Sequence, residues 1–379
     1  MERILKNRIF IVNRLWITFW MLSIFGCSQN ESSVLPVVNI KSVLLHPEEV
    51  SLSDIISEMN IIPLETNDSC LIGRGRVFCL LKEGILFNDI GLLKFGMDGT
   101  FMGNVFQFGQ GPGEIAGLRD FYVRDSLIYF TDLSHYLYKC DFSGTRMERV
   151  KIPLYTQNGF AALENNKFVT GTLEWGDGDK ADRLCFFDTV RVTKKIHKLY
   201  STKGKYQESY PMGKEIKFFH FKGETYMKEL LNDTIYRIDE KNDTICPFLY
   251  YDFGRYKSHP EYRYNFSANE LFFKIPYTQF LGITDNYVFL TVMMPDVRKK
   301  ESIDALCIYE RQTKKSRLLR LSYSADDIKK IKSVIGNRFD EKSNPYFFPM
   351  SLSQDGEYLC TLIPQVEDDN PTIIAIRLK

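Results

Sequence analysis

A short hairpin pattern recurs along the whole chain, and it restricts the fold more than any other feature. Residues 93–101 and 138–146 both read as a strand, a tight turn with Gly99 or Gly144, and a second strand. Asp-Gly and Ser-Gly supply the positive φ that hairpin turns need. Looser copies occupy residues 184–193, 235–245 and 306–318, and residues 373–378 resemble the first strand of a sixth copy. Six copies of one hairpin predict a repeat architecture.

The spacing of the copies identifies the repeat unit. The anchor residues are Phe95, Cys140, Phe187, Ile238, Tyr309 and Ile376. They are separated by 45, 47, 51, 71 and 67 residues, and a propeller blade of four strands takes about 40–45 residues. The two longest intervals therefore carry insertions, which we place near residues 251–280 and 322–337. In the second insertion, isoleucines recur at helical spacing and Ser324 is positioned to cap a helix.

The two ends of the repeat complement each other. The segment around Pro63 shares Ile-Pro-Leu with the outer strand around Pro153, and proline suits an outermost strand because it cannot donate in a central ladder. We therefore predict an all-β, six-bladed β-propeller that closes by pairing residues 60–66 with residues 373–378. Closure removes exposed sheet edges. The alternative architecture is two packed β domains.

The first 26 residues read as a secretory signal. A basic start is followed by an apolar run at residues 15–25, which is shorter than the about 20 residues of a membrane span. Gly26 and Cys27 then precede a polar stretch, as in a bacterial lipobox, so we predict that Cys27 carries the lipid. Several acyl chains anchor a protein stably to a membrane. The alternative is an ordinary cleaved signal.

These segments define the predicted domains. Residues 1–26 are the signal peptide, residues 27–51 are a tether that leads into the propeller, and residues 52–379 are the propeller. Without the signal the formal net charge changes from +1 to −2. A nucleic-acid-binding protein would show a basic excess, so we expect no nucleic-acid partner.

The eight cysteines do not suggest a metal or redox site. Lipidation of Cys27 leaves seven, and none is spaced as Cys-x-x-Cys. Apolar, strand-like surroundings indicate buried side chains for four of them, Cys140, Cys185, Cys307 and Cys360. Cys70 and Cys79 could instead pair across a hairpin.

A glycine-rich stretch follows the first hairpin. Residues 109–114 read Gly-Gln-Gly-Pro-Gly-Glu, but the Lys-Ser/Thr pair of a phosphate-binding loop is missing. The glycines fit a sharp crossing from the outer strand of one blade to the inner strand of the next. Glu114 would then lie near the ring axis, where its carboxylate could accept backbone amides.

Two local patterns resemble a known family. The hairpin Phe-x-x-x-Gly at residues 95–99, with Cys in place of Phe at residues 140–144, and the stretch at residues 106–114 are similar to the six-bladed β-propeller lipoproteins of Gram-negative gut-type bacteria. The resemblance covers about residues 52–379. It implies a propeller with a lipid anchor, and it supplies no catalytic residues.

Two further segments are candidate sites. Asp177, Asp179 and Asp182 could supply oxygen ligands to calcium, although their spacing is not that of an EF-hand and a solvated hairpin tip is the alternative. The insertion at residues 251–280 is rich in aromatic side chains, which suit sugar rings or protein partners. The candidate binding residues in it are Tyr256, His259, Tyr262, Arg263 and Tyr264.

These patterns favour a binding module over an enzyme. No Gly-x-Ser-x-Gly or His-x-x-x-His signature occurs, and we expect no cofactor. We expect a lipoprotein of the cell envelope, in the outer membrane, that binds a partner protein or a glycan and takes part in nutrient handling. The alternative is a hydrolase or lyase that acts on a glycan or a lactone in the axial pocket.

Overall fold

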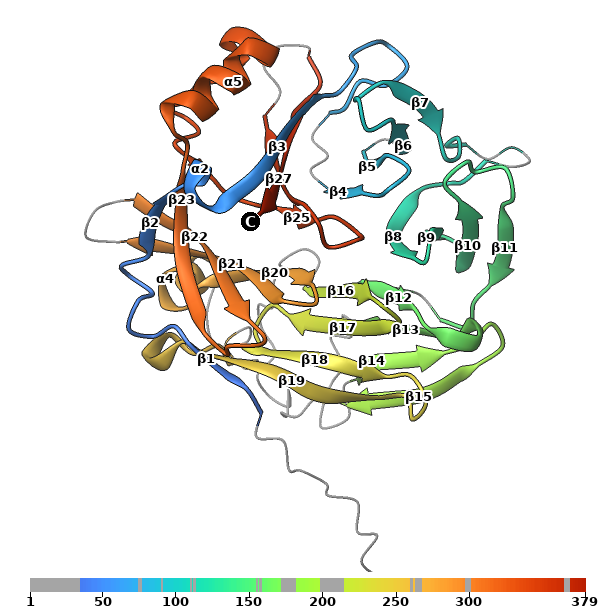
Figure 1. Ribbon diagram of the computed structural model, residues 1–379. Coiled ribbons are helices and arrows are strands. Elements are labelled where there is room, and N and C mark those ends of the chain that lie inside the picture. Colours follow the sequence, from blue (N-terminus) through green and yellow to red (C-terminus); the bar gives the residue numbers. More distant parts are fainter. Residues whose placement is uncertain are drawn as a thin grey trace, which may run out of the picture. The chain divides into compact units, whose positions relative to one another are not determined.

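The computed structural model describes a propeller unit within residues 36–379. The described residues are 35–73, 77–89, 91–109, 111, 114–154, 156, 159–171, 182–197, 215–259, 262, 268–296, 301–364 and 369–379. Six antiparallel sheets stand around one axis (Figure 1). The prediction of an all-β, six-bladed β-propeller is therefore confirmed.

The first three blades each have four strands, which follow one another from the axis outward. Blade 1 contains β4 (Val77–Leu80), β5 (Ile85–Asn88), β6 (Leu92–Phe95) and β7 (Phe101–Asn104). Blade 2 contains β8 (Leu118–Arg124), β9 (Leu127–Asp132), β10 (Tyr136–Asp141) and β11 (Glu148–Lys151). Blade 3 contains β12 (Phe160–Ala162), β13 (Phe168–Gly171), β14 (Asp182–Phe187) and β15 (Val192–His197), with η1 (Glu164–Asn166) between its first two strands.

The other three blades carry the additions. Blade 4 contains β16 (Ile216–Phe221), β17 (Glu224–Glu229), β18 (Thr234–Asp239) and β19 (Thr244–Asp252), followed by η2 (Gly254–Tyr256) and α4 (Ala268–Lys274). Blade 5 contains β20 (Tyr277–Ile283), β21 (Tyr287–Asp296), β22 (Glu301–Glu310) and β23 (Ser316–Ser322), followed by α5 (Ala325–Ile335), η3 (Gly336–Arg338) and β24 (Tyr346–Phe347). Blade 6 contains β25 (Ser351–Leu352), β26 (Leu359–Ile363), β27 (Thr372–Leu378) and β3 (Ile56–Pro63).

The repeat found in the sequence is the outer half of each blade. All six anchor residues lie on the third strand, namely on β6, β10, β14, β18, β22 and β27. Gly99 and Gly144 have φ of +88° and +76°, as the Asp-Gly and Ser-Gly turns require. Turn chemistry therefore determined where the third strand of a blade turns back into the fourth.

The predicted closure of the ring is also confirmed. β3 pairs antiparallel with β27, and Pro63 lies opposite Thr372. The strand begins at Ile56, four residues before the predicted start, and it ends at Pro63. Beyond it the Leu64 amide still donates to the Pro371 carbonyl at 3.3 Å. The outermost strand of blade 6 thus comes from the beginning of the propeller.

The segment before β3 lies along the outer rim of three successive blades. β1 (Val37–Asn39) pairs in parallel with β19 of blade 4, and β2 (Glu48–Ser51) pairs in parallel with β23 of blade 5. The short helix α2 (Leu52–Ile55) then leads into β3 of blade 6. Residues 36–51, which fall within the predicted tether, therefore contribute a fifth strand to two blades.

Helix α5 packs on this rim beside β3 (Figure 1). Ser324 caps it as predicted, since its hydroxyl accepts the Asp327 amide at 3.1 Å and the Asp327 carboxylate accepts the Ser324 amide at 2.8 Å. Ile331 and Ile335 are buried against the core. None of the helices that the structure describes combines the length and hydropathy of a membrane span.

The hydrophobic core lies between blades. One cluster joins residues of blades 4, 5 and 6, and another joins blades 2, 3 and 4. Every residue of β14 is buried, because each sheet packs against a neighbour on both faces. This explains why the middle strands read as apolar runs. The four cysteines predicted to be buried are buried, and the seven described cysteines, Cys70 and Cys79 among them, are free thiols.

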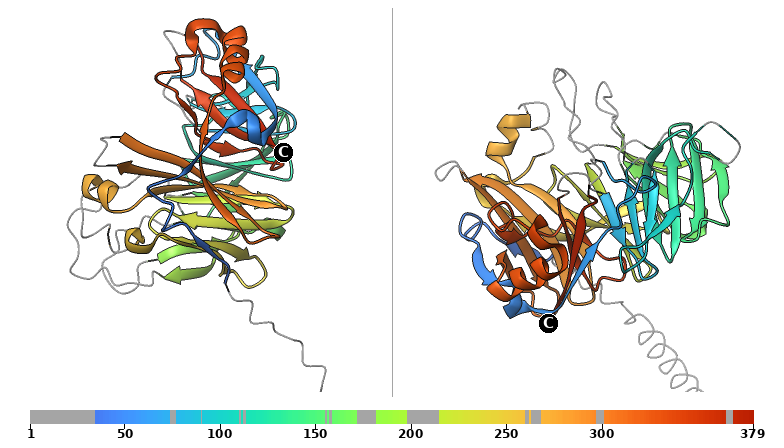
Figure 2. Two further views of the ribbon diagram at one scale, coloured as in Figure 1. Left: turned by 60° about the vertical axis from the view of Figure 1, so that its left-hand side comes forward. Right: turned by 90° about the horizontal axis from the view of Figure 1, so that it is seen from above.

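The two faces of the ring differ in their connections. On one face, the turn face, first and second strands and third and fourth strands are joined by turns such as residues 125–126 and 222–223. On the other face, the loop face, the fourth strand of each blade crosses to the next blade through eight or more residues. Helix α4 stands out from the ring on this side (Figure 2). The differences in connection length between the blades are therefore largest on the loop face.

Candidate binding site in the axial channel

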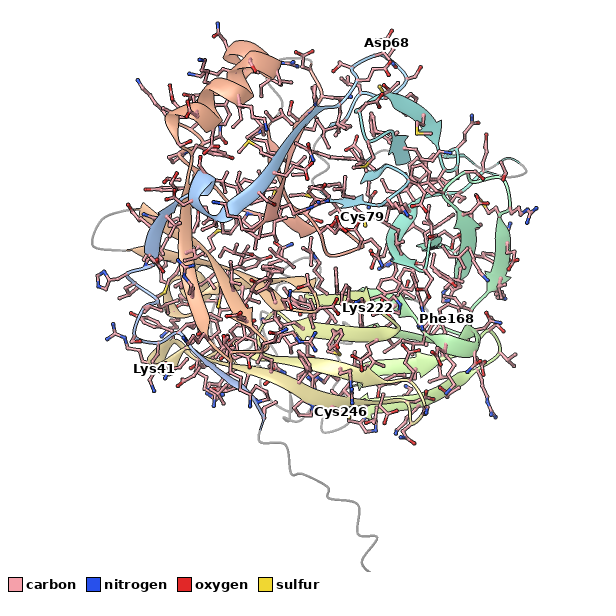
Figure 3. All side chains as sticks on the ribbon, in the orientation of Figure 1. Lys41, Asp68, Cys79, Phe168, Lys222 and Cys246 are labelled. Atoms are coloured by element: carbon pink, nitrogen blue, oxygen red, sulfur yellow. The ribbon has the colours of Figure 1, made fainter. Side chains whose placement is uncertain are left out.

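A cavity of about 460 Å³ lies on the axis of the ring. All six blades line it with their innermost strands, β4, β8, β12, β16, β20 and β25. Cys79 of β4, for example, lies close to the centre of the ring, whereas Cys246 lies on the rim (Figure 3). A volume in this range suits a small ligand or the end of a chain molecule.

The turn of blade 6 crosses the turn-face end of this cavity. The Gln354 amide donates to the Leu80 carbonyl of blade 1 at 2.9 Å, and its side-chain Nε2 donates to the Val123 carbonyl of blade 2 at 3.2 Å. Gln354 also lines the cavity. Gln354 therefore joins three blades at the turn-face end of the cavity.

The wall of the cavity combines aromatic and polar side chains. The aromatic ones include Phe160, Phe218 and Phe280. Charged groups come from the loop-face halves of the strands, among them Asp120 of blade 2 and Glu215 of blade 4. Burial raises the pKa of the Cys79 thiol to about 12, so this cysteine stays protonated and is a poor nucleophile. The wall is suited to binding through stacking and hydrogen bonds.

A cluster of polar side chains near the turn face links blades 2, 3 and 4. The buried Arg124 guanidinium donates to both oxygens of Glu240 at 3.1 Å and to the Ala162 carbonyl at 3.0 Å. Glu240 also accepts the Thr225 hydroxyl at 2.9 Å and the Glu164 amide at 2.6 Å. The charge of each partner is compensated directly, as buried ion pairs require.

His220 belongs to the same cluster and also lines the cavity. Its Nδ1 lies 3.3 Å from the Thr225 hydroxyl and its Nε2 lies 3.4 Å from Asp125. Burial, together with the nearby Arg124 charge, lowers the pKa of this imidazole below its usual value. We therefore assign a neutral ring to His220 at pH 7.

Lys228 lies at the opposite, loop-face end of the β16–β17 hairpin. It is 3% exposed, and its Nζ donates to the Thr278 hydroxyl of blade 5 at 2.7 Å and to the Glu229 carbonyl at 3.0 Å. Lys228 and Thr278 both line the cavity. Burial lowers the pKa of the Lys228 amine to about 8. Within the described part of the chain no carboxylate comes within 4.0 Å of this Nζ.

The nearest carboxylates are engaged elsewhere. The Glu229 carboxylate accepts hydrogen bonds from the Arg183 guanidinium of blade 3, and the distance from Arg183 Nε to Glu229 Oε1 is 2.7 Å. This ion pair joins blades 3 and 4. Asp233 accepts a hydrogen bond from the Ser258 amide at 2.8 Å through Oδ2, whereas its buried Oδ1 has no hydrogen-bond partner among the described residues. Burial raises the pKa of Asp233. Lys228 is therefore a buried amine without a carboxylate in direct contact among the described residues.

The aromatic insertion reaches the loop-face end of the cavity through a small apolar cluster. Tyr262 packs with Leu230, Leu271 and Tyr277, and Leu230 and Tyr277 also line the cavity. The ring of His259 lies 5.3 Å from that of Tyr262. Among the predicted binding residues that the structure describes, Tyr262 is therefore connected to the axial site through this cluster.

Two other predicted binding residues, Tyr256 and Glu114, lie outside the cavity lining. Tyr256 packs against the core and accepts a hydrogen bond from Arg255 at 2.7 Å. Arg263 and Tyr264 lie outside the described residues, as does Cys27. Glu114 is absent from the cavity lining and accepts the Gly111 amide at 2.7 Å. Its carboxylate occupies the place where a Cβ on Gly109 would lie, only 1.8 Å away, so the loop is the predicted crossing between β7 and β8.

The predicted calcium ligands are divided in the same way. Asp177 and Asp179 lie outside the described residues. Asp182 is buried in β14, where its carboxylate pairs with Lys195 and with His197 Nδ1 at 3.0 Å. Among the residues that the structure describes, no group of three or more His, Cys, Asp or Glu side chains could hold a metal ion.

The sequence did not single out Lys228, Asp120 or Glu215. The repeat could have indicated two of them. It locates the third strand of each blade and therefore also the first strand, which lies next to the axis. Charged residues near the starts of these first strands, such as Asp120 and Glu215, are candidates on this ground alone. Lys228 needed the pairing of β17 with β16, which only the structure supplied.

Comparison with known proteins agrees with the fold. A family described as a domain of unknown function, DUF4934, matches residues 35–374. The chain belongs to the DUF4934 family. No curated protein matches this DUF4934 chain.

One solved structure shares the architecture of this DUF4934 protein. The crystal structure of a candidate exported protein from Bacteroides fragilis superposes with a TM-score of 0.63 at 16% identity, covering 91% of this chain and 100% of that chain. YCF48 bound to D1 peptide gives a TM-score of 0.40 at 9% identity, covering 87% and 97% of the two chains. The first likeness supports the propeller fold of the DUF4934 chain.

Proposed function

We propose that this protein is a lipid-anchored propeller of the cell envelope that binds a glycan in its axial cavity. The observation that carries the proposal is the cavity itself, which all six blades line and which Gln354 bridges at the turn face. Aromatic rings with adjacent hydrogen-bonding groups suit sugar rings. The first strand of each blade starts, and its fourth strand ends, at the loop face.

The anchor determines how far the propeller extends from the membrane. The Pro36 carbonyl accepts the Tyr250 amide at 3.0 Å, so the chain is fixed to the rim of blade 4 from that residue on. Residues 28–35 separate it from the proposed lipid on Cys27, and eight extended residues span at most about 30 Å. Substituting Cys27→Ser should abolish incorporation of labelled palmitate and release the protein from the membrane fraction.

The glycan proposal is tested with the detergent-solubilised full-length chain on an array of envelope, plant and host glycans. We expect binding that is weakened by Gln279→Ala, because Gln279 lines the cavity. The matched control is Gln312→Ala, whose side chain lies in an exposed turn of blade 5. Failure of all glycans to bind, with recovery of one envelope protein in a pull-down, would replace the glycan with a protein partner.

One observation favours a second candidate, a glycan hydrolase. Asp120 and Glu215 line the same cavity from blades 2 and 4, and glycoside cleavage uses two carboxyl groups that flank the scissile bond. Any glycan that binds should be incubated with the protein and with Asp120→Asn. Release of fragments that depends on Asp120 would favour the hydrolase, and intact recovery of the glycan would favour the binding module.

A further inference from the structure

Lys228 carries a charge that the described protein leaves without a contact anion. A buried ammonium is costly unless a nearby anion and hydrogen bonds compensate it. Two buried ion pairs near the β16–β17 hairpin follow that rule, as Arg124 with Glu240 and Arg183 with Glu229 show. Lys228 departs from it at a point that borders the axial cavity.

The ammonium has room for one more acceptor. It carries three donors, of which two are used by the Thr278 hydroxyl and the Glu229 carbonyl. Both named oxygens are neutral. A negatively charged oxygen from a ligand in the cavity would complete the set with a charge-assisted bond.

The other charged groups around Lys228 do not take this place. On β17 the Glu229 carboxylate is held by Arg183, and beyond that strand Asp233 is held by the Ser258 amide. From β16 come Glu215 and Lys217, from β8 comes Asp120, and β20 contributes the uncharged Thr278 and Gln279. Only the lysines among these cavity groups attract an anion.

We infer that the loop-face end of the axial cavity is a subsite for a carboxylate-bearing sugar, with Lys228 and Thr278 as its recognition pair. The inference rests on the proposed function and deepens it, because it names the class of glycan. A uronic or sialic type of acid would place its carboxylate against Nζ, and the aromatic wall would cover the ring. A neutral sugar of the same shape would leave the ammonium uncompensated.

The test compares each acidic oligosaccharide with its own methyl ester, so that only the charge differs. The panel contains galacturonate, glucuronate and sialic acid oligosaccharides, titrated into the full-length chain by calorimetry. A charge-assisted hydrogen bond predicts that the acid binds roughly 10- to 100-fold more tightly than the ester. Equal binding of acid and ester would overturn the subsite and leave the glycan proposal standing, whereas no binding by any pair would remove both.

Two lysine variants show whether Lys228 is responsible. Lys228→Met should lower the affinity for the acid to that for the ester and leave the affinity for the ester unchanged. Lys94→Met is the matched control, because Lys94 is also buried, donates to the Ser143 carbonyl at 2.8 Å and does not line the cavity. If Lys228→Met keeps the preference for the acid, the assignment to Lys228 is wrong.

The pH dependence provides an independent readout. The protonated amine binds the carboxylate, so the preference for the acid should be constant well below pH 8. It should then decrease as the pH rises through the pKa of about 8 of the free protein. A preference that does not change between pH 6 and pH 10 would point to recognition by a group other than Lys228.

Discussion

The two ends of the β16–β17 hairpin differ in the number of acceptors that surround a buried cation. At the turn face, Arg124 has a bidentate carboxylate, a carbonyl and two further acidic neighbours. At the loop face, Lys228 has one hydroxyl and one carbonyl. Both side chains are buried to a similar degree, at 6% and 3% exposed. The difference indicates that the first cluster stabilises the ring, whereas the second retains a charge that does not help folding.

The connections follow the same division. The turn face is built from tight turns, two of which place Asp125 and Lys222 at positive φ, and these turns leave little freedom for added residues. The loop face carries the crossings between blades and the insertion with α4. Structural ties therefore lie at the turn-face end of the axis and the candidate binding groups lie at the loop-face end.

The largest expected effect is on the turn-face cluster. Glu240→Ala leaves the buried Arg124 without its bidentate partner and should destabilise the propeller by about 3–5 kcal/mol. Chemical denaturation measures it. The double variant Arg124→Met with Glu240→Leu should recover most of this loss, because an apolar pair carries no desolvation penalty. If the double variant is as unstable as the single one, the cluster acts through shape and not through charge.

His220 provides a pH-dependent test of the same end. Its pKa is lower in the folded than in the unfolded chain, so the unfolded state binds more protons near pH 6. Stability should therefore fall as the pH decreases below about 6.5. The slope from this group is at most about 1.4 kcal/mol per pH unit. His220→Gln should reduce the slope between pH 5 and pH 7, and an unchanged slope would exclude His220 as its source.

Ser324→Ala is a control on the rim, away from both ends of the β16–β17 hairpin. It removes the cap of α5 and the contact with the Ser53 hydroxyl at 2.7 Å. The expected cost is about 1 kcal/mol in free energy of unfolding, with no change in ligand binding. A change in binding of the acidic oligosaccharide by this variant would mean that the rim and the axis are coupled.

The smallest expected effect on stability is that of Lys228→Met. Replacing a buried ammonium with an apolar side chain of similar length should leave the free energy of unfolding unchanged within about 1 kcal/mol, or raise it. Thermal and denaturant unfolding measure this change. A loss of about 3 kcal/mol or more would contradict the contrast between the two ends and would make Lys228 a structural residue.

Several features of the fold could be predicted because they depend on local chemistry. Gly99 and Gly144 mark turns that only a few residue types permit, and these turns recur at blade spacing. Pro63 is the last residue of the outer strand β3, as suits a residue without a donor, whereas Pro153 lies two residues beyond the end of the outer strand β11. Ser324 marks the start of α5 for the same local reason, since its hydroxyl satisfies an amide three residues on.

The candidate site could not be predicted in this way. Lys228 looks like any strand lysine until β17 is paired with β16 and β20 is placed beside it. Tyr256 was a candidate because its segment is rich in aromatic residues, but its ring packs against the core. Asp182 was a candidate calcium ligand, but it pairs with Lys195 on β15, the outer strand of the same blade. Neighbours that are far apart in sequence decided the role of each of these residues.

The sequence by itself determined the number of blades, the closure of the ring and the location of the turns, because these depend on short patterns and their spacing. The tertiary structure alone decided that Gln354 joins blade 6 to blades 1 and 2, that residues 36–51 line the rim and that Lys228 has no contact anion among the described residues. Such features depend on which blades become neighbours and on how much water they exclude. Burial changes the energetic cost of a charge, and burial is a property of the folded ring.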